Sequence, residues 1–192
     1  MLMLWAGVLL FFAPHCVSIV APHWRDRMLL RVGAARWKGG YSILASIGFT
    51  LLVLGFIEAR RVPVVLYISP ALMRPVSLLL MLPVFPLLLA TYFPGRFLAR
   101  VQHPLLSATL LWATAHLLSN GRLPDVVLFG SFLLWALADR LSVEARAASR
   151  MRRAAPTRYN DVLAIVLGLG LYALTILKLH GWLFGVPLRG EF

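Results

Sequence analysis

Two apolar runs lie between residues 103 and 140, and a short, mainly polar break at residues 119–123 joins them. Each run is about long enough to cross the hydrocarbon core of a bilayer, which takes roughly 20 apolar residues at 1.5 Å per residue. Gly121 and Pro124 are residue types that end one helix and begin the next. The sequence therefore predicts a helical hairpin inside a membrane.

The rest of the chain likewise consists of apolar runs joined by more polar connections. The 192 residues are 60% hydrophobic and only 14% charged, whereas a soluble domain has roughly 45–50% apolar and about 25% charged residues. Because lipid offers no hydrogen bonds to the backbone, such runs span a bilayer as helices. We expect an all-α, polytopic membrane helix bundle with about six transmembrane helices, forming one domain over residues 1–192. The predicted spans outside the hairpin are residues 2–21, 41–57, 75–93 and 161–179.

The connections differ in character. Residues 23–40 carry five basic side chains and interleaved Trp residues, which favours either a helix lying on the headgroup surface or a solvated basic loop. Residues 62–73 are apolar but too short to span, and they predict an interfacial or partly re-entrant connection. Pro83 and Pro86 should bend the third span. Residues 140–158 predict a helical extension that ends before Pro156.

The net charge of +12 is better explained by membrane orientation than by nucleic-acid binding, because the 19 basic residues are dispersed among the connections. Counted on alternate sides of six spans, thirteen Lys and Arg residues fall on one side and six on the other. Basic residues concentrate on the cytoplasmic side. Both termini are therefore predicted to lie outside the cytoplasm, and residues 23–40 and 140–158 to share the cytoplasmic face.

Histidines are the main candidates for chemistry. The seven acidic residues lie mostly at span ends, and the sequence has no zinc signature, nucleotide-binding loop or nucleophile elbow, which argues against hydrolysis and assigns no catalytic residue. Of the five histidines, only His15 and His116 lie well inside apolar runs. An ionisable side chain there is costly, so each is a functional hypothesis by default. The alternative is that each histidine hydrogen-bonds a neighbouring carbonyl or hydroxyl.

The surroundings of His116 suit a flat ligand. Trp112 and Asn120 lie near its helical face, together with Thr109, Ala113 and Ser119, and this mixture can either cradle an aromatic cofactor or pack without one. Counted from the predicted cytoplasmic edge, His15 and His116 differ in depth by roughly 9 Å. Two ligands on opposite sides of a tilted cofactor plane could cover that offset. His103, followed by Pro104, is interpreted as a helix-start residue.

A family resemblance follows from motifs spread over almost the entire chain. They are Trp37-Lys38-Gly39-Gly40-Tyr41-Ser42, His103-Pro104, Leu111-Trp112-Ala113, Ala115-His116-Leu117-Leu118, Asn120-Gly121, Leu128-Phe129-Gly130, Trp135-Ala136, Asp139-Arg140 and Leu179-His180-Gly181-Trp182. With these motifs in order, the sequence closely resembles the NnrU family. That resemblance implies a bacterial inner-membrane protein linked to denitrification and nitric oxide metabolism.

The same pattern is shared with plant zeta-carotene isomerases, which bind haem b in the membrane. The resemblance implies haem b as a cofactor, with His15 and His116 as the metal ligands. Those isomerases have a cysteine three residues before the second histidine, where this chain has Ala113. Thiolate ligation at that position is therefore ruled out, and isomerase activity does not follow from haem binding. A shorter similarity, through Arg100 and His103-Pro104, is to isoprenylcysteine-type membrane methyltransferases.

Three hypotheses follow. The first is a haem-binding membrane protein of nitrogen-oxide metabolism, the second a non-catalytic membrane factor that supports expression or assembly of nitrogen-oxide reductases, and the third an enzyme of the isomerase or methyltransferase type. Membrane lipids are expected partners in each, and proteins of nitrogen-oxide metabolism in the first two. An absorption spectrum separates the first hypothesis from the second and from an enzyme of the methyltransferase type.

Overall fold

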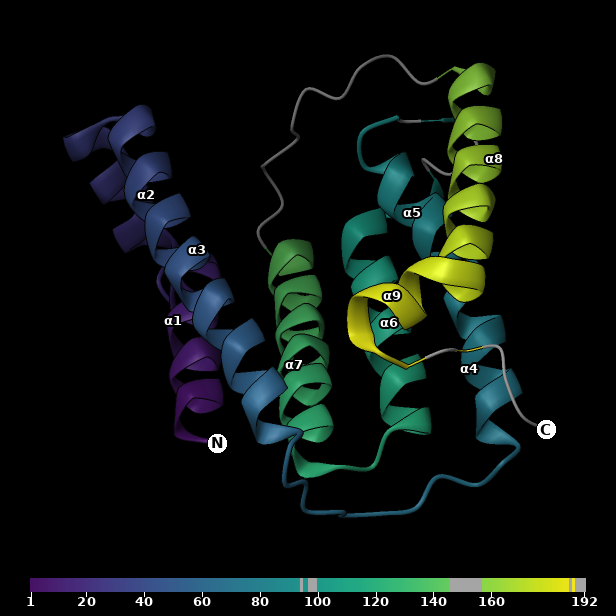
Figure 1. Cartoon of the computed structure of the whole chain (residues 1–192). Coiled ribbons are helices and arrows are strands. Elements are labelled where there is room, and N and C mark those ends of the chain that lie inside the picture. Colours follow the sequence, from purple (N-terminus) through teal and green to yellow (C-terminus); the bar gives the residue numbers. More distant parts are fainter. Residues whose placement is uncertain (94, 97–99, 146–156, 187, 189–192) are drawn as a thin grey trace. The chain divides into compact units, whose positions relative to one another are not determined.

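The computed structural model describes residues 1–93, 95–96, 100–145, 157–186 and 188, and these are mainly helical. Figure 1 shows the helices along the chain. Their bounds are α1 Leu2–Val20, α2 Pro22–Val32, α3 Ala34–Ala59, α4 Met73–Met81, α5 Val84–Ala90, α6 Pro104–Ser119, α7 Leu123–Ala145, α8 Arg158–Leu174, the π-helical turn η2 Thr175–Leu179 and α9 His180–Phe184. The predicted all-α class is confirmed.

Among the described residues, five helical stretches are long and apolar enough to cross a membrane: Leu2–Val20, Ala34–Ala59, Met73–Tyr92, Leu123–Val143 and Arg158–Phe184. The remaining predicted span, the fourth along the chain, is α6, with 16 residues and a length of about 24 Å. It is shorter than the roughly 30 Å hydrocarbon core. The chain is thus a multi-pass membrane protein, in which one apolar helix falls short of a full span.

Two predicted boundaries are wrong. The second span begins at Ala34 and not at residue 41, because α3 continues through Arg36 and Lys38; long basic side chains can keep their charges at the headgroups while their stems stay on the helix. The last span continues through η2 to Phe184 instead of ending at residue 179.

The connection between the first two spans is helical, which excludes the loop interpretation. It forms α2, which contains no buried residue. Gly33 then separates α2 from α3 with a φ of 84°, a conformation that favours glycine. The structure thus agrees with an amphipathic surface helix followed by a sharp change of direction.

The predicted bend in the third span is also confirmed. Helix α4 ends at Met81 and α5 begins at Val84. Pro83 has no backbone N–H to donate and so interrupts the hydrogen-bond ladder there. The predicted extension after the hairpin begins as the end of α7, which reaches Ala145, while residues 146–156 lie outside the described residues.

The chain divides into two compact units. Unit 1 comprises Met1–Pro70 and His116–Ala147, and unit 2 comprises Ala71–Ala115 and Ala148–Phe192. Each is described by itself below. That the two together form a single domain stays a prediction.

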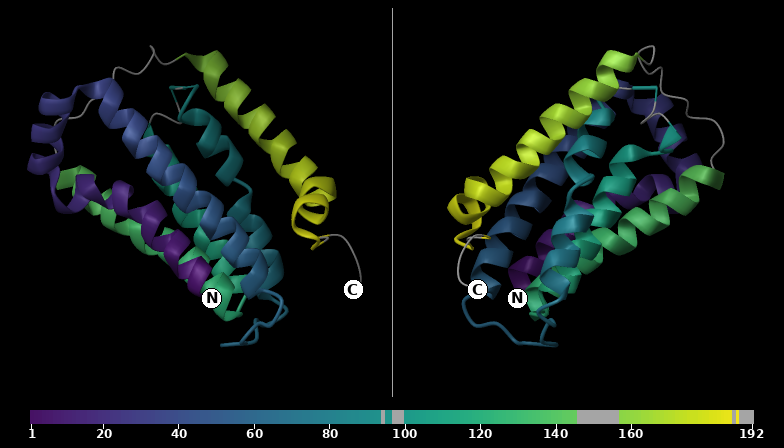
Figure 2. Two further views of the ribbon diagram at one scale, coloured as in Figure 1. Left: turned by 60° about the vertical axis from the view of Figure 1, so that its left-hand side comes forward. Right: turned by 90° about the vertical axis from the view of Figure 1, so that its right-hand side faces the viewer.

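In unit 1, α1 and α3 form a close antiparallel pair, side by side in Figures 1 and 2. Glycines line the contact between these two helices, which is called the α1–α3 seam below. A Cβ at Gly7 would overlap the backbone of Leu52, and one at Gly48 would overlap the backbone of Phe11. Gly55 stands in the same relation to Leu4. Small residues let helix backbones approach closely in membranes, where dispersion rather than the hydrophobic effect drives packing.

Helix α7 completes unit 1 and runs parallel to α1. Phe132 packs edge-on against Phe12, with ring centroids 5.0 Å apart, and also contacts Phe11 at 5.6 Å. Nearer the start of α7, Phe129 meets Phe56 of α3 at 6.5 Å. Aromatic side chains therefore fill the space among these three helices.

The apolar connection over residues 62–70 is non-helical and pairs with the hairpin turn. The Leu66 and Tyr67 N–H groups donate to the Gly121 carbonyl at 2.8 and 3.2 Å, and the Leu123 N–H donates to the Val64 carbonyl at 2.8 Å. These bonds satisfy backbone groups that a helix end otherwise leaves unpaired. The connection and the turn are thus held together at one end of unit 1.

In unit 2, the bent third span packs between α6 and α8. Pro86 lies against Gly168, where a Cβ would overlap the proline. The Tyr172 hydroxyl donates to the Leu78 carbonyl at 2.7 Å, and the Ser77 hydroxyl donates to the Ala115 carbonyl at 2.7 Å. The core consists of Val84, Leu87, Ala90, Ala108 and Ala164.

Candidate functional site

His15 lies half-buried on α1 and has a fixed ring orientation. Its Nδ1 lies 2.6 Å from the carbonyl oxygen of Phe11, one turn earlier. A carbonyl can only accept, so this bond assigns the ring proton to Nδ1 and leaves the Nε2 lone pair as the acceptor. Metal-ligating histidines are commonly held in this way, with one nitrogen donating to a backbone carbonyl.

Aromatic rings surround His15. The nearest are Phe11, with centroids 4.4 Å apart, Tyr41 of α3 at 5.1 Å, and Trp135 of α7 at 5.6 Å and nearly perpendicular. The indole Nε1 of Trp135 is buried, and no partner for it occurs among the described residues. A buried donor without a partner costs about 1–3 kcal/mol.

His116 lies half-buried near the end of α6. Its ring is stacked on Phe129, with centroids 4.4 Å apart and planes 28° apart. Asn120 is engaged with the backbone here: its side-chain amide donates to the His116 carbonyl at 2.9 Å, and its own N–H donates to the same oxygen at 2.8 Å. Asn120 therefore closes the helix end, and its role as a cofactor-binding residue stays a prediction.

Two other residues near His116 in the sequence have structural partners in unit 2. Trp112 packs against the core cluster of that unit. The Thr109 hydroxyl donates to the Leu105 carbonyl within its own helix, at 3.0 Å. Ala113, which stands where the isomerases have cysteine, is fully buried. Trp112 as a cofactor-binding residue stays a prediction.

Helix α7 is the element that both histidines touch. His15 contacts Trp135 and His116 contacts Phe129. These residues are six positions apart, which corresponds to about 9 Å along the helix and about 120° around it. The distance along α7 between these two contacts is about the same as the difference in depth between His15 and His116 that the sequence predicts. The two contacts nevertheless lie on different sides of α7, so the described contacts alone do not define a shared cavity.

His103 precedes α6, as predicted. The helix begins at Pro104, and the His103 carbonyl accepts from the Ser107 N–H at 3.1 Å. Its φ of 58° is uncommon for a residue with a side chain. The structure thus confirms a helix-start residue.

A buried ion pair was missed by the sequence analysis. Asp125, in the first turn of α7, is only 2% exposed. Its Oδ1 lies 3.9 Å from the Nε of Arg60, whereas its buried Oδ2 has no partner among the described residues. The N-terminus of α7 also favours a carboxylate. The signal in the sequence was an acid and a base at the ends of two spans on the same predicted side.

Tyr67 and Ser69 add polar contacts nearby. The Tyr67 hydroxyl donates to the carbonyls of Leu117 and Asn120, the latter at 2.9 Å. The Ser69 hydroxyl donates to the Leu118 carbonyl at 2.6 Å. Burial raises the pKa of the Tyr67 phenol above its ordinary value of 10.0, and the Asp125 carboxylate raises it further. These side chains therefore fasten the connection to the end of α6.

Taken together, the fold and these side chains define a multi-pass α-helical membrane protein with two intramembrane histidines set among aromatic rings. Comparison with known families is more specific. The family model described as NnrU protein matches residues 3–188. The chain belongs to the NnrU family. Neither a curated protein nor a solved structure matches the sequence.

Proposed function

We propose that this NnrU-family protein binds haem b in the membrane, and that His15 and His116 would hold its iron. The observation that carries the proposal is the bond from His15 Nδ1 to the Phe11 carbonyl, because it presents Nε2 as a ligand within an apolar helix. A second supporting observation is that Trp135, whose ring contacts His15, has a buried Nε1 without a partner among the described residues. Bound haem would supply one-electron redox chemistry.

The protein's own residues would position the ligands and exclude water. The Phe11 carbonyl fixes the tautomer of His15 and increases the basicity of its ring. Phe129 stacks on the face of the His116 ring; a metal is bound in the ring plane, so this stacking orients the ligand without covering the bonding direction. The rings around His15 keep the site apolar, and burial is one of the properties that tune a haem potential.

A place in nitric oxide and denitrification metabolism is part of the same proposal. It rests on the family's link to that metabolism, and the bacterial inner membrane is the corresponding location. Both termini are proposed to be periplasmic, since the basic residues are distributed thirteen to six. In unit 1, α1 and α7 run parallel to each other and antiparallel to α3, which agrees with alternating spans.

The second candidate is a non-catalytic membrane factor that supports expression or assembly of nitrogen-oxide reductases. The observation that favours it is that both histidines already have packing roles: His15 bonds a carbonyl of its own helix, and His116 stacks on Phe129. Under this hypothesis the histidines stabilise the fold and bind nothing.

Haem titration of the purified protein in mild detergent separates the two candidates. We expect the native protein to show a low-spin bis-histidine spectrum, and His15→Ala and His116→Ala each to lose that spectrum. His180→Ala is the matched control, because its ring is near the exposed end of the last span and bonds the Val186 carbonyl. Circular dichroism verifies that each variant remains folded. If both folded variants keep the native spectrum, or the native protein never shows it, the second candidate replaces the first.

A further inference from the structure

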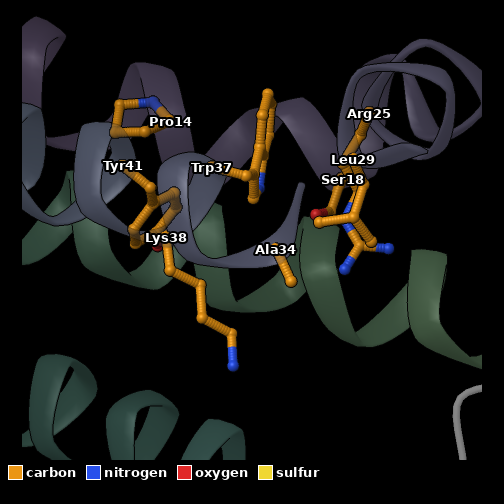
Figure 3. Close-up of a pocket in the computed structure, with 8 residues that line it drawn as sticks. All are labelled: Pro14, Ser18, Arg25, Leu29, Ala34, Trp37, Lys38 and Tyr41. Carbon is orange, nitrogen blue, oxygen red and sulfur yellow. The ribbon is translucent and has the colours of Figure 1, made fainter. Parts of the chain in front are cut away.

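A pocket lies among the first three helices of unit 1, and Figure 3 shows its lining side chains. It is a half-open groove with a volume of about 520 Å³, within the range of small-molecule sites. Helix α1 supplies two of the lining residues, α2 two and α3 four. They are Pro14, Ser18, Arg25, Leu29, Ala34, Trp37, Lys38 and Tyr41.

The change of direction at Gly33 builds this pocket. It folds α2 back beside the start of α3, and Trp24 meets Trp37 edge-on with ring centroids 5.8 Å apart. Each helix therefore contributes a cation to the pocket: Arg25 comes from α2 and Lys38 from α3. Both cations line the same pocket although they are 13 residues apart in sequence.

The charge balance favours an anionic occupant. Arg25 forms an ion pair with Asp26, its Nη1 lying 2.9 Å from the carboxylate, but both side chains are well exposed, at 41% and 59%. Exposed pairs of this kind are worth about 0–1 kcal/mol, so Arg25 can turn to another anion at little cost. Residues 23–40 hold five basic side chains against one acid.

The remaining walls are apolar or aromatic. Leu29 and Pro14 offer hydrocarbon, while Trp37 and Tyr41 offer rings of the kind that collect at membrane interfaces. A soluble anion would gain nothing from these walls, whereas an amphiphile would use both the cations and the apolar surface. The pocket thus combines the two features that a membrane-embedded anion requires.

We propose that this pocket binds the anionic oxygen group, phosphate or carboxylate, of a membrane-embedded amphiphile through Arg25 and Lys38. Such a group has two sources. One is the phosphate of an anionic phospholipid. The other is the carboxylates of a haem ligated by His15, because Tyr41 both lines the pocket and packs on that histidine at 5.1 Å. The haem source rests on the proposed function; the phospholipid source does not.

The test compares two double variants with equal loss of charge. Arg25→Gln with Lys38→Gln removes both cations of the pocket. Arg27→Gln with Arg36→Gln is the control, since these exposed residues also come from α2 and α3 but do not line the pocket. Haem-free protein is reconstituted in phosphatidylcholine vesicles with and without phosphatidylglycerol, extracted in mild detergent, and analysed by native mass spectrometry for retained lipid. Haem titration of the same proteins is the second measurement.

If phospholipid is the source, the pocket variant retains phosphatidylglycerol at least about tenfold less than the control, as the loss of charge-assisted hydrogen bonds implies. If haem is the source, lipid retention is equal in the two variants, but the pocket variant binds haem more weakly by a similar factor with an unchanged spectrum. Equal lipid retention together with equal haem affinity overturns the proposal. Lipid retention by the haem-free protein does not depend on His15 or His116. The phospholipid outcome can therefore still be observed if the protein does not bind haem.

Discussion

The close contact between α1 and α3 predicts that the same substitution, Gly→Ala, has opposite effects on stability at two positions of α3. In Gly48→Ala the new methyl group would overlap the Phe11 backbone, which cannot move without separating the helices. Overpacking of this kind costs typically about 1–3 kcal/mol, and sometimes more. In Gly40→Ala nothing lies within 4 Å of the new methyl group, and the helix gains up to about 1 kcal/mol from alanine's better propensity.

The measurement is thermal unfolding in mild detergent, followed by circular dichroism. One kcal/mol corresponds to about 2–4 °C in Tm for a chain of this size. Gly48→Ala should therefore lower the Tm by roughly 2–12 °C, while Gly40→Ala should leave it equal or slightly higher. Gly55→Ala, at the other end of the seam, should behave like Gly48→Ala. If Gly48→Ala were as stable as Gly40→Ala, the close approach of α1 and α3 would be wrong.

Three further predictions concern the hairpin end and the topology. Arg60→Ala should destabilise the protein by about 3 kcal/mol in chemical denaturation, because it leaves the buried Asp125 carboxylate without its nearest cation; adding Asp125→Asn should recover most of that loss, and a double variant no better than the single one would contradict this pairing. The raised pKa of Tyr67 stabilises the folded state below the unfolded pKa of about 10, and this contribution is lost as the pH rises through the folded pKa. The free energy of unfolding of Tyr67→Phe should therefore fall less steeply with pH above about pH 10 than that of the native protein, although the variant is less stable at neutral pH. Parallel pH profiles of the two proteins would count against the raised pKa. A reporter fused after Phe192 should be active in the periplasm only, and cytoplasmic activity would reverse the proposed orientation.

The spans and the bend could be predicted because each depends on local composition. Apolar runs of sufficient length must be helical in lipid, and the missing N–H of Pro83 interrupts the ladder whatever surrounds it. The start of α3 could not be predicted in this way, because the hydropathy of residues 34–40 is low while their helical structure continues with Arg36 and Lys38 at the surface. The start of α3 was therefore placed seven residues too late.

Long-range pairings could not be predicted. The contact between residues 64–67 and the hairpin turn joins residues 54 to 59 positions apart, and no local pattern encodes it. The ion pair of Arg60 with Asp125 and the pocket of Arg25 and Lys38 are of the same kind, since each depends on which helices become neighbours. For the site, the sequence identified His15 and His116, but not that Trp135 and Phe129 of one helix would meet them.

The two units are interleaved in the chain, and this has a consequence for biosynthesis. Unit 1 needs both Met1–Pro70 and His116–Ala147, so it cannot be completed until the ribosome has added the 77 residues from 71 to 147. At about 5–20 residues per second this takes roughly 4–15 s. During that interval the newly inserted pair of α1 and α3 presents Phe11, Phe12 and His15 to lipid or to an insertion factor instead of to α7. A nascent chain stalled at Ala115 would keep this aromatic surface uncovered, and any chaperone of membrane insertion that assists this protein should be captured there.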